Sequence, residues 1–399
     1  FAQVFTRGGF DLQVGNPPWV RPTWKDNETL SEADPWFMLE PKIPEKAFAT
    51  RRIEVLSSHN ERTYYLADLT SIAAMSSVLG SPVEHSVLAG VQINLYMLFM
   101  ERAWRSMNGD GVVGLLHPEG HFVDPKAGRF REIVYQKLRR HWNFENEANL
   151  FEEVGHHASF SVNIYGSSRK VAFIQAVGLQ VVRTLEDSLV GPFSGEKPGI
   201  QLREGGWDRR HHPARIVKVD ERVLRIWGRL IDDSGIPASQ ARLMRPLLKD
   251  HQNVLEVLAE STAIGENVEV SPAWHEKNAK QDGTMVWRTE VPPSWGDAIL
   301  QGPHFYVGAP FAKNPREVVK HNSDYDPWDL KELPEFCIPR TNYQRAVSRE
   351  QYDARIDRWN GEPSWDYWRV AVRRMVYAGT ERSLIPALIP VGAAHVDAV

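Results

Sequence analysis

The sequence contains almost no cysteine. Cys337 is the single cysteine among 399 residues, which excludes an internal disulfide framework and a zinc site built from cysteines. Such a chain fits a reducing compartment, so we expect the protein to be cytoplasmic. No apolar run approaches the roughly 18 residues of a membrane span, and no secretory signal is visible. We therefore expect no membrane partner.

The sequence also lacks a strong charge of either sign. Its formal net charge of −4 excludes a wholly basic, histone-like DNA binder, but it allows an enzyme that confines positive charge to one cleft. A phosphate-binding Walker loop, a zinc finger, a nucleophile elbow and a nuclease-type carboxylate cluster are all missing. The adjacent histidines at 156–157 and 211–212 have no carboxylate at ligand spacing, so we expect no metal site.

Tryptophan and proline are abundant by contrast. The 14 Trp and 26 Pro are spread along the chain and predict large irregular loops with aromatic anchors, most of which pack in the core. A hydrophobic content of 42% and a charged content of 25% are typical of a globular protein. The length is sufficient for two domains, each with its own core.

Strand-like and helix-like segments alternate up to about residue 175, which is typical of a parallel α/β sheet. The predicted strands are Phe10–Val14, Val112–Leu116, Ser159–Tyr165 and Lys170–Gly178. The last two are adjacent in the chain and could pair antiparallel. The predicted helices are Ile93–Met107 and Phe130–Trp142.

The pattern becomes irregular beyond about residue 180, which predicts a second domain of loops, small sheets and a few helices. Within it we expect helices over Arg222–Asp232 and Ala238–Arg245. We place the boundary within 176–205 and divide the chain into domains 1–180 and 181–399. The stretch Lys25–Leu88 exceeds a normal loop, and it is a candidate for an insertion that closes over DNA.

The tetrapeptide Asn16-Pro17-Pro18-Trp19 follows the first predicted strand after one glycine. It therefore lies at the carboxyl end of that strand, where open α/β sheets bind ligands. Two prolines fix the backbone and remove two amide donors. The result is a rigid turn that presents hydrogen-bond acceptors, the Asn16 side-chain oxygen and main-chain carbonyls, beside the flat face of Trp19.

This arrangement suits the methylation of an adenine amino group. The nitrogen of that group is a poor nucleophile because its lone pair is delocalised into the ring. Two acceptors, one for each N–H, localise the lone pair and stabilise the positive charge that develops as a methyl group arrives. The base must first leave the duplex, at a cost of a few kcal/mol. Stacking on an aromatic ring offsets this with about 1–3 kcal/mol.

The segment GGFDLQVGNPPWVRP resembles motif IV of amino-methyltransferases, whose pattern is Asp/Asn/Ser-Pro-Pro-aromatic. With Asn first, it is similar to adenine-N6 enzymes rather than cytosine-N4 enzymes. The family that it resembles most is the gamma class of DNA methyltransferases found in fused type II restriction-modification enzymes and in phage-defence systems. The resemblance implies a site-specific adenine DNA methyltransferase in which Asn16 and the Pro17 carbonyl hold the amino group and Trp19 stacks on the flipped base.

Later segments resemble further motifs in the same order. QINLYMLFMERAW (92–104), GDGVVGLLHPEGHF (109–122) and FREIVYQKLRRHW (130–142) are similar to motifs V, VI and VII. NLFEEVGHHASFSVNIYG (149–166) is similar to motif VIII, where an aromatic ring contacts the base. This implies Phe151 as the second stacking ring, with Phe160 as its rival. His117-Pro118-Glu119-Gly120 lies in the motif VI loop, and we expect it to have a structural role.

The C-terminal segment WRVAVRRMVYAGTERSLIPALIPVG (368–392) resembles the Arg-rich end of specificity domains in this group. Together these likenesses imply a fold made of the C-terminal part of a Rossmann-like class I methyltransferase domain, followed by a mixed α+β target-recognition domain. They also imply double-stranded DNA as partner, other restriction or defence subunits as further candidates, and a monomer. The arginines implied for DNA binding are Arg340, Arg373, Arg374 and Arg382.

The family binds its cofactor, S-adenosylmethionine, through a glycine-rich motif that precedes motif IV, and this sequence lacks that motif. Gly8-Gly9 lies before a strand rather than after one. The chain begins at Phe1 without capping or targeting residues, so we interpret it as a fragment that begins inside a domain. We expect this piece alone to be inactive, with a sheet that lacks its first strands and exposes an edge.

Two other functions remain open. Methyltransferases for protein glutamine or for RNA bases share Asn-Pro-Pro-aromatic turns, although they usually lack a large C-terminal domain. The second alternative is a non-catalytic DNA-specificity module whose catalytic half has decayed. The intact Asn16–Trp19 turn disfavours it, because decay would tolerate changes there.

Overall fold

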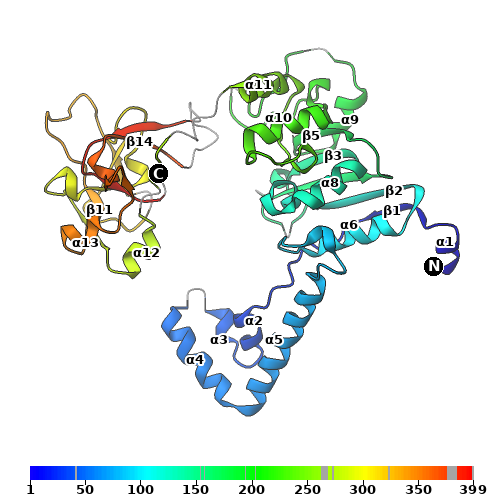
Figure 1. Ribbon diagram of the computed structural model, residues 1–399, viewed down its shortest axis with the longest axis horizontal. Helices are drawn as coiled ribbons and strands as arrows, with labels where there is room; N and C mark the ends of the chain where they lie inside the picture. The colour runs from blue at the N-terminus through cyan, green and yellow to red at the C-terminus, as the bar shows by residue number, and fades with distance from the viewer. Residues whose placement is uncertain are drawn as a thin grey trace. The chain divides into compact units, whose positions relative to one another are not determined.

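The computed structural model describes residues 1–40, 43–152, 154–156, 158–193, 195–202, 204–261, 268–271, 274–321, 324–374 and 384–397. The chain divides into two compact units, Phe1–Thr262 and Ala263–Val399 (Figure 1). No helix within the described residues is long and apolar enough to cross a membrane.

The centre of unit 1 is a mixed β-sheet. Within the described residues its strands are β1 (Phe10–Gly15), β2 (Met107–Pro118), β3 (Leu138–Glu145), β4 (Ser159–Tyr165), β5 (Ala172–Leu179) and β6 (Val217–Asp220). Their spatial order is β1-β2-β4-β3-β5-β6. β1 is parallel to β2 and β3 is parallel to β5. β4 is antiparallel to both β2 and β3, and β6 is antiparallel to β5. The predicted strands are all present, but the sheet is not purely parallel.

The predicted antiparallel pairing of β4 with β5 is wrong, because β3 lies between them. The segment that forms β3 was assigned to the end of the predicted helix Phe130–Trp142. The helix, α8 (Gly128–Lys137), stops earlier, and the strand begins at Leu138 without an intervening glycine or proline. Trp142 and Phe144 pack into one apolar cluster. His141, the residue before Trp142, forms a hydrogen bond with Asn163 on the opposite face of the sheet. This alternation has the period of a strand rather than of a helix.

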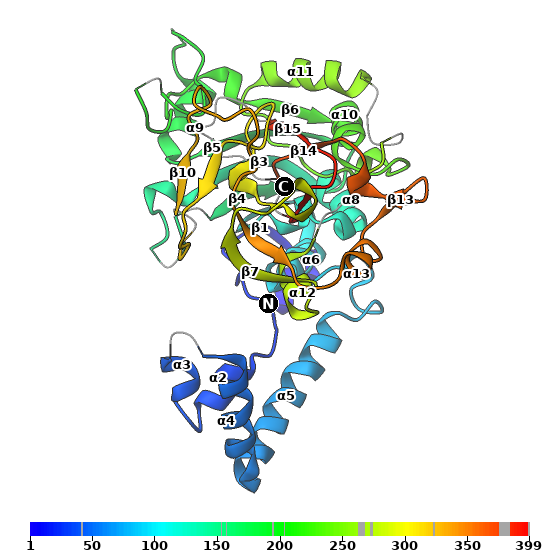
Figure 2. The same cartoon turned by 90° about the vertical axis from the view of Figure 1, so that its left-hand side faces the viewer.

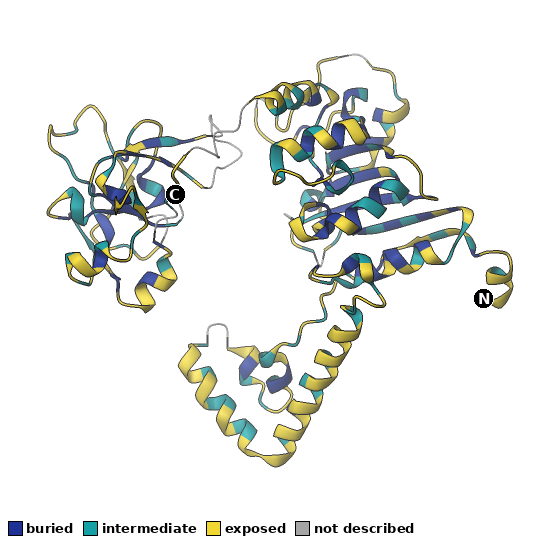
Figure 3. Ribbon diagram, viewed as in Figure 1, coloured by how far each residue is buried: buried dark blue, intermediate teal, exposed yellow. Residues whose placement is uncertain are grey.

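Helices cover both faces of the sheet (Figure 1). On one face, α6 (Leu95–Arg105), α8 and α10 (Glu221–Ile231) enclose the largest apolar cluster of the chain's described residues. Asn94 caps α6 by accepting a hydrogen bond from the Tyr96 N–H, at 3.5 Å, as N-cap residues do. On the other face, α9 (Val182–Val190) packs Leu185 against a smaller, mainly aromatic cluster. Figure 3 shows the strands between these helices as mostly buried.

The expected domain boundary within 176–205 does not coincide with the division between units, which falls after Thr262. The intervening segment packs on the sheet, since β6 pairs with β5 and α10 joins the main core. Helix α11 (Lys249–Glu260), which the sequence did not predict, is linked to α10 by a 2.9 Å hydrogen bond from Trp227 Nε1 to Gln252 Oε1. Trp227 lies after the expected boundary but is buried in the core that residues before the boundary form, so both sides belong to one unit.

The two helices predicted beyond residue 180 have different outcomes. Arg222–Asp232 is confirmed as α10, displaced by one residue. Ala238–Arg245 is wrong, because the structure has only the 3₁₀ turn Ala238–Gln240 there. The carbonyl of Gln240 accepts from Arg131 Nε at 3.0 Å, and the next carbonyl accepts from Tyr135 Oη at 2.8 Å. These side chains of α8 hold the segment extended across the core.

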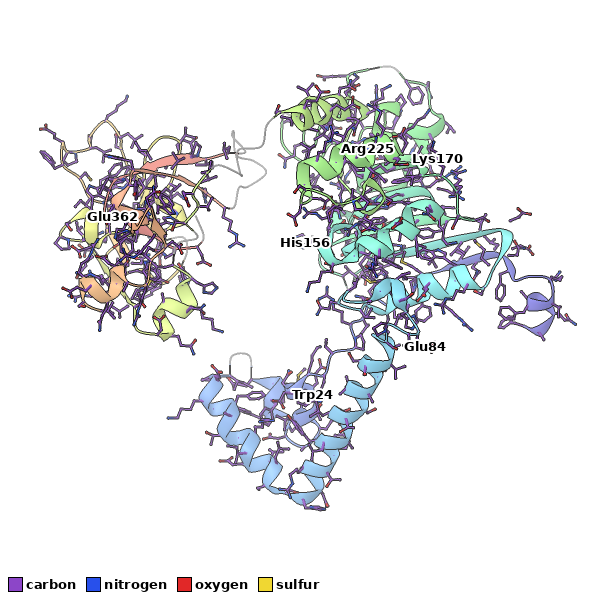
Figure 4. All side chains as sticks on the ribbon, in the orientation of Figure 1. Trp24, Glu84, His156, Lys170, Arg225 and Glu362 are labelled. Carbon is purple, nitrogen blue, oxygen red and sulfur yellow. The ribbon has the colours of Figure 1, made fainter. Side chains whose placement is uncertain are left out.

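The long insertion between β1 and α6 is helical. It contains α2 (Asp26–Ser31), α3 (Trp36–Leu39), α4 (Glu45–Ser57), α5 (His59–Leu79) and the 3₁₀ turn η1 (Ser86–Leu88). Leu30, Phe37 and Tyr65 form a small core of its own, with Trp24 packed against it (Figure 4). Helices α4 and α5 meet at one end and diverge (Figures 1 and 2), with α2 and α3 between them (Figure 1), and both are largely exposed (Figure 3).

The two ends of the insertion meet at its stem. Leu95 N–H donates to the Val20 carbonyl at 2.9 Å, and Arg21 Nη1 donates to Gln92 Oε1 at 2.9 Å. Residues 25–88 hold ten carboxylates against six lysines and arginines, a net charge equal to that of the whole chain. The expected role of the insertion in closing over DNA stays a prediction, which would require its few cations to lie on one face.

Strand β1 lies at the edge of the sheet, and among the described strands it pairs only with β2. Two apolar side chains along it, Leu12 and Val14, are 64% and 79% exposed. The chain enters β1 from the short helix α1 (Ala2–Thr6) through Gly9, whose φ is +122°. A Cβ at Gly9 would lie 2.5 Å from the Ser106 carbonyl oxygen, so only glycine fits there.

Unit 2 is built from short elements. Its described helices are α12 (Glu276–Gln281) and α13 (Arg349–Asp353). Its described strands are β7 (Met285–Glu290), β8 (Ile299–Leu300), β9 (Lys313–Pro315), β10 (Tyr325–Pro327), β11 (Thr341–Arg345), β12 (Arg358–Trp359), β13 (Glu362–Pro363), β14 (Arg369–Val372), β15 (Pro386–Ile389) and β16 (Ala394–His395). They pair as β11-β7, β10-β9, β12-β13, β14-β15 and β16-β8. Small sheets and few helices were predicted for this region.

Aromatic side chains hold unit 2 together. Tyr352 stacks on Trp365 with ring centroids 4.8 Å apart, and it accepts a 2.9 Å hydrogen bond from Trp274 Nε1. All three rings are buried. Because the strands are too short to form an extended core, the packing of large rings replaces it.

Candidate active site

The Asn16–Trp19 turn begins where β1 ends. Gly15 pairs with Leu115 of β2, and the chain then turns away at Asn16. Pro17 is buried, whereas the Asn16 side chain is exposed. No hydrogen bond within the described part of the chain involves the Asn16 side chain or the Pro17 carbonyl. Both acceptors predicted to hold an amino group are therefore without a partner among the described residues, and the Asn16 side chain is also exposed.

The ring of Trp19 meets both aromatic residues that the sequence suggested. Its centroid is 5.8 Å from that of Phe151, edge to face, and 5.9 Å from that of Phe160. Its Nε1 donates to the Leu116 carbonyl at 3.4 Å. Phe160 is 2% exposed and stacks on Phe144, so it belongs to the core. Phe151 is only partly buried, which leaves it the better placed of the two rivals for contact with a ligand.

The rings of Trp19 and Phe151 touch each other. A flat base between two aromatic rings needs about 7 Å between their planes, because carbon atoms pack at about 3.5–4.0 Å. The 63° edge-to-face contact at 5.8 Å leaves no such space. A base therefore enters only when one of the two rings moves aside.

Asn146 fixes the position of Phe151, and the sequence analysis did not single it out. Its Oδ1 accepts from the Phe151 N–H at 3.0 Å, and its Nδ2 donates to the carbonyls of Phe151 and Val154 at 2.9 and 2.7 Å. Asn146 is fully buried at the end of β3. An asparagine at a strand end, shortly before an aromatic residue, is too common a pattern to have identified it.

A buried polar network occupies the same edge of the sheet, on the face opposite the aromatic rings. His117 Nε2 lies 2.8 Å from Tyr165 Oη and 3.0 Å from Asn163 Nδ2. Asn163 Oδ1 lies 2.8 Å from His141 Nδ1. The His117 ring also stacks on Tyr96, with centroids 5.1 Å apart. Burial lowers the pKa of His117 to about 4, so its imidazole is neutral at pH 7.

Glu119 is the charged member of this network. Its carboxylate lies 2.5 Å from Arg245 Nη2 and 3.1 Å from His141 Nε2. Neither contact has hydrogen-bond angles, so the pairing is mainly electrostatic. Burial raises the pKa of Glu119, but the electrostatic attraction of His141 and Arg245 outweighs it and lowers the pKa to about 2. The ion pair of Glu119 with Arg245 links the loop that follows β2 to the segment after α10. The structural role expected for this loop stays a prediction.

Among the described residues, no glycine loop is placed to cradle S-adenosylmethionine. A glycine loop that cradles the cofactor follows a strand, whereas Gly8 and Gly9 lie between α1 and the start of β1. No group of three or more His, Cys, Asp or Glu side chains that could hold a metal ion occurs among the described residues. His157, one of the four histidines considered for metal binding, lies outside the described residues.

The arginines expected to bind DNA differ in their exposure and in the contacts that they already make. Arg373 is partly exposed at the end of β14, and Arg374 beside it is exposed. Arg340 is less free, because its Nη1 donates to the Pro315 carbonyl at 2.9 Å and its Nη2 lies 3.9 Å from the Glu317 carboxylate. Arg382 lies outside the described residues.

Comparison with known proteins gives limited results. No family model matches the chain, and no curated protein matches it. The similar solved structures include the methyltransferase subunit of a type I restriction-modification system from Streptococcus thermophilus, at 13% identity and a TM-score of 0.22 over 42% of this chain and 26% of that one. They also include the type IIG restriction endonuclease BpuSI, at 16% identity and a TM-score of 0.21 over 36% of this chain and 18% of that one.

A third similar structure is a nuclease-deletion mutant of the type ISP restriction-modification enzyme LlaGI in complex with a DNA substrate mimic, at 16% identity and a TM-score of 0.21. It covers 41% of this chain and 12% of that one. The chain thus spans about a quarter or less of the length of these three proteins. At TM-scores below 0.5, these likenesses to restriction-modification proteins support no conclusion about activity.

Proposed function

We propose that this chain carries the amino-group-binding part of an S-adenosylmethionine-dependent DNA methyltransferase that acts on the N6 position of adenine. One observation carries the proposal. Asn16 and the Pro17 carbonyl are free acceptors at the carboxyl end of β1, directly beside the ring of Trp19. The resemblance of this turn to motif IV supplies the substrate class.

The chemistry of the turn is hydrogen-bond acceptance. The Asn16 oxygen takes one N–H of the amino group and the Pro17 carbonyl takes the other. As the nitrogen acquires positive charge, both contacts strengthen, and this differential stabilisation lowers the barrier. The methyl donor supplies an electrophilic methyl group for direct in-line transfer, with no covalent enzyme intermediate.

The aromatic residues hold the base. A flipped adenine stacks on Trp19 when Phe151 moves aside, and Phe151 then closes against the other face. Asn146 limits that movement, because its side chain is hydrogen-bonded to both the N–H and the carbonyl of Phe151. Stacking worth about 1–3 kcal/mol offsets the cost of extracting the base from the duplex.

The cofactor site requires residues beyond those of this chain. The open edge of β1, with exposed Leu12 and Val14, is suited to the addition of further strands. In the same proposal, unit 2 reads the DNA sequence, with Arg373 and Arg374 as candidates for phosphate or guanine contact. Arg340 is a weaker candidate, because its side chain is already bonded within the unit.

Single-molecule sequencing of DNA tests the proposal. Cells would express the complete gene that encodes this chain, beside its Asn16→Ala variant. We expect N6-methyladenine at one recurring DNA motif, absent in the variant. No modified base in either sample would contradict the proposal and favour a protein or RNA acceptor, or a DNA-specificity module without catalysis.

A further inference from the structure

A cavity in unit 2 has no part in the methyl-transfer proposal. Its volume is about 820 Å³, within the range of about 300–1,000 Å³ that ligand sites occupy. Its walls come from β7, the segment after β8, the β9–β10 pair and the end of β14. All of its lining residues belong to unit 2, so the site is complete within one unit.

Aromatic rings provide much of the wall. Trp287 is 46% exposed and Tyr306 is 50% exposed, although both are large apolar surfaces. Trp328 and Phe311 stand at 89° to each other, with centroids 6.2 Å apart. Flat faces that remain open to a cavity are suited to stacking on a flat ligand.

Buried polar groups form a rigid part of the lining. Gln301 Oε1 accepts from Asn342 Nδ2 at 2.9 Å and from Tyr325 Oη at 3.2 Å. Gln301 Nε2 donates to Glu276 Oε1 at 3.2 Å, which fixes a carboxylate at the cavity. Because each group is held by another, the polar lining is preorganised.

One donor in the lining lacks a partner. Trp328 Nε1 is shielded from solvent, and no acceptor within the described residues receives its hydrogen. A buried N–H without an acceptor costs about 1–3 kcal/mol. Protein atoms cover this N–H, so a ligand acceptor reaches it only when the Trp328 side chain turns, and the new hydrogen bond would then recover that cost. With Trp328 turned, its N–H and the Glu276 carboxylate would provide one donor and one acceptor, which is what the edge of a nucleobase requires.

Two cations complete the lining. Lys313 is exposed on β9, and Arg373 is partly exposed after β14. Neither takes part in an ion pair or side-chain hydrogen bond anywhere in the described ranges. Uncompensated cations beside aromatic faces are characteristic of sites that bind a base together with its phosphate.

We propose that this cavity binds an unpaired nucleotide of DNA. The base stacks between aromatic faces at Trp287 and Trp328, its edge meets the Trp328 N–H and the Glu276 carboxylate, and its phosphates lie near Lys313 and Arg373. The proposal rests on the proposed DNA binding of unit 2 and adds a site that recognises a base outside the helix. It is separate from the adenine site at Asn16, since it shares no residue with it.

The test compares two duplexes that differ by one bulged 2-aminopurine. The full chain is titrated against each duplex, and both anisotropy and 2-aminopurine fluorescence are measured. We expect roughly tenfold tighter binding of the bulged duplex, the size of one base stacked on an aromatic ring, and quenching of the probe. Trp287→Ala and Trp328→Phe should reduce this preference, the second because it keeps a ring but removes the N–H.

Matched controls separate the cavity from general effects. Trp368 is 64% exposed in the same unit but outside this lining, so Trp368→Ala should keep the preference. Lys313→Gln should weaken binding of the bulged duplex, whereas Arg358→Gln, at an exposed cation on β12 outside this lining, should not. Circular dichroism of each variant verifies folding.

The Trp19→Ala variant assigns the preference to one of the two sites. A preference that survives Trp19→Ala and is lost in Trp287→Ala supports the inference. If the preference for the bulged duplex depends on Trp19 alone, or if both duplexes bind equally, the inference about the cavity is overturned. The proposed DNA binding of unit 2 would remain intact. Failure to bind either duplex overturns both.

Discussion

The two aromatic sites of this protein differ in whether they leave space for a ligand. At the Asn16–Trp19 turn, the rings of Trp19 and Phe151 are in contact, and the free groups are neutral acceptors. In the cavity of unit 2, partly exposed rings such as Trp287 line a volume of about 820 Å³, with unpaired cations beside them. The first site is closed by its own side chains, whereas the second is already open.

This difference indicates how binding energy is used at each site. At the closed site, part of the stacking energy is spent on moving a ring, so weak or wrong ligands are excluded. At the open site there is no such cost, and affinity follows from stacking and charge alone. A selective reaction site and a tolerant recognition site are the expected functions of the two arrangements.

The largest expected effect concerns the acceptors of the closed site. With a complete enzyme, Asn16→Ala should lower the methyl-transfer rate by about 100- to 1,000-fold, as the loss of one contact to a developing charge does. Asn16→Asp keeps an acceptor oxygen and should lose much less. Rates are measured in single-turnover assays with a methyl-labelled cofactor. Equal rates for the Ala and Asp variants would refute the acceptor role.

Lowering the pH should destabilise both units, and unit 1 over the wider pH range. Burial lowers the pKa of His117 in unit 1 and of His395 in unit 2 to about 4. The unfolded chain, with histidine near 6.5, therefore binds more protons than the folded chain between pH 6.5 and 4. The free energy of unfolding should fall as the pH drops through this window, by on the order of 3 kcal/mol for each histidine.

In unit 1 alone, Glu119 extends the loss of folding stability to lower pH. Its pKa of about 2, against 4.5 in the unfolded chain, makes stability fall further between pH 4.5 and 2. Urea unfolding at a series of pH values measures both effects. His395→Gln should reduce the dependence of unit 2 above pH 4 without altering that of unit 1, and should leave the part due to His304, whose pKa burial also lowers. A stability that is constant from pH 7 to 4.5 would contradict the assignment of neutral buried histidines.

A pair of tryptophan variants contrasts the two sites directly. Trp19 packs on the aromatic cluster and bonds the Leu116 carbonyl, so Trp19→Ala should lower the free energy of unfolding by about 2 kcal/mol. Trp287 is half exposed, and Trp287→Ala should cost less than about 1 kcal/mol. Chemical denaturation of both variants measures this. Equal losses would mean that the second site is as closely packed as the first.

The smallest expected effect is electrostatic. Arg373→Gln should reduce the dependence of DNA affinity on salt by about one counterion, a change of a few-fold in affinity. Arg340→Gln should leave that dependence unchanged, since its side chain is bonded to the Pro315 carbonyl. Affinities are measured by anisotropy between low and moderate salt. A reversed result would assign the phosphate contact to Arg340.

The sequence predicted those parts of unit 1 whose signal is local. The strand ending at Gly15, and therefore the place of Asn16, follows from a short apolar run and two prolines. Trp19 lies beside both Phe151 and Phe160, the two rings that the sequence proposed. What remains a prediction is their role, since neither stacking on a base nor methyl transfer has been tested.

Other features depend on contacts that are distant in the sequence. The place of β3 between β4 and β5 was missed because strand order is not a local property, and Leu138 follows α8 without a break. Glu119 meets Arg245, and Gln240 meets Arg131, across more than a hundred residues. Such pairs hold residues beyond 180 on the sheet, which is why the expected domain boundary differs from the observed division.

The stem of the helical insertion has a further consequence. Its two ends are already tied together by the Val20–Leu95 and Arg21–Gln92 hydrogen bonds, so a short bridge could replace α2 to α5 at little entropic cost. The segment around Leu88 would have to stay, because Leu88 is buried in the main core of unit 1. The length, charge and surface of the helices can be redesigned or swapped while the neighbouring Asn16 turn stays anchored to β2.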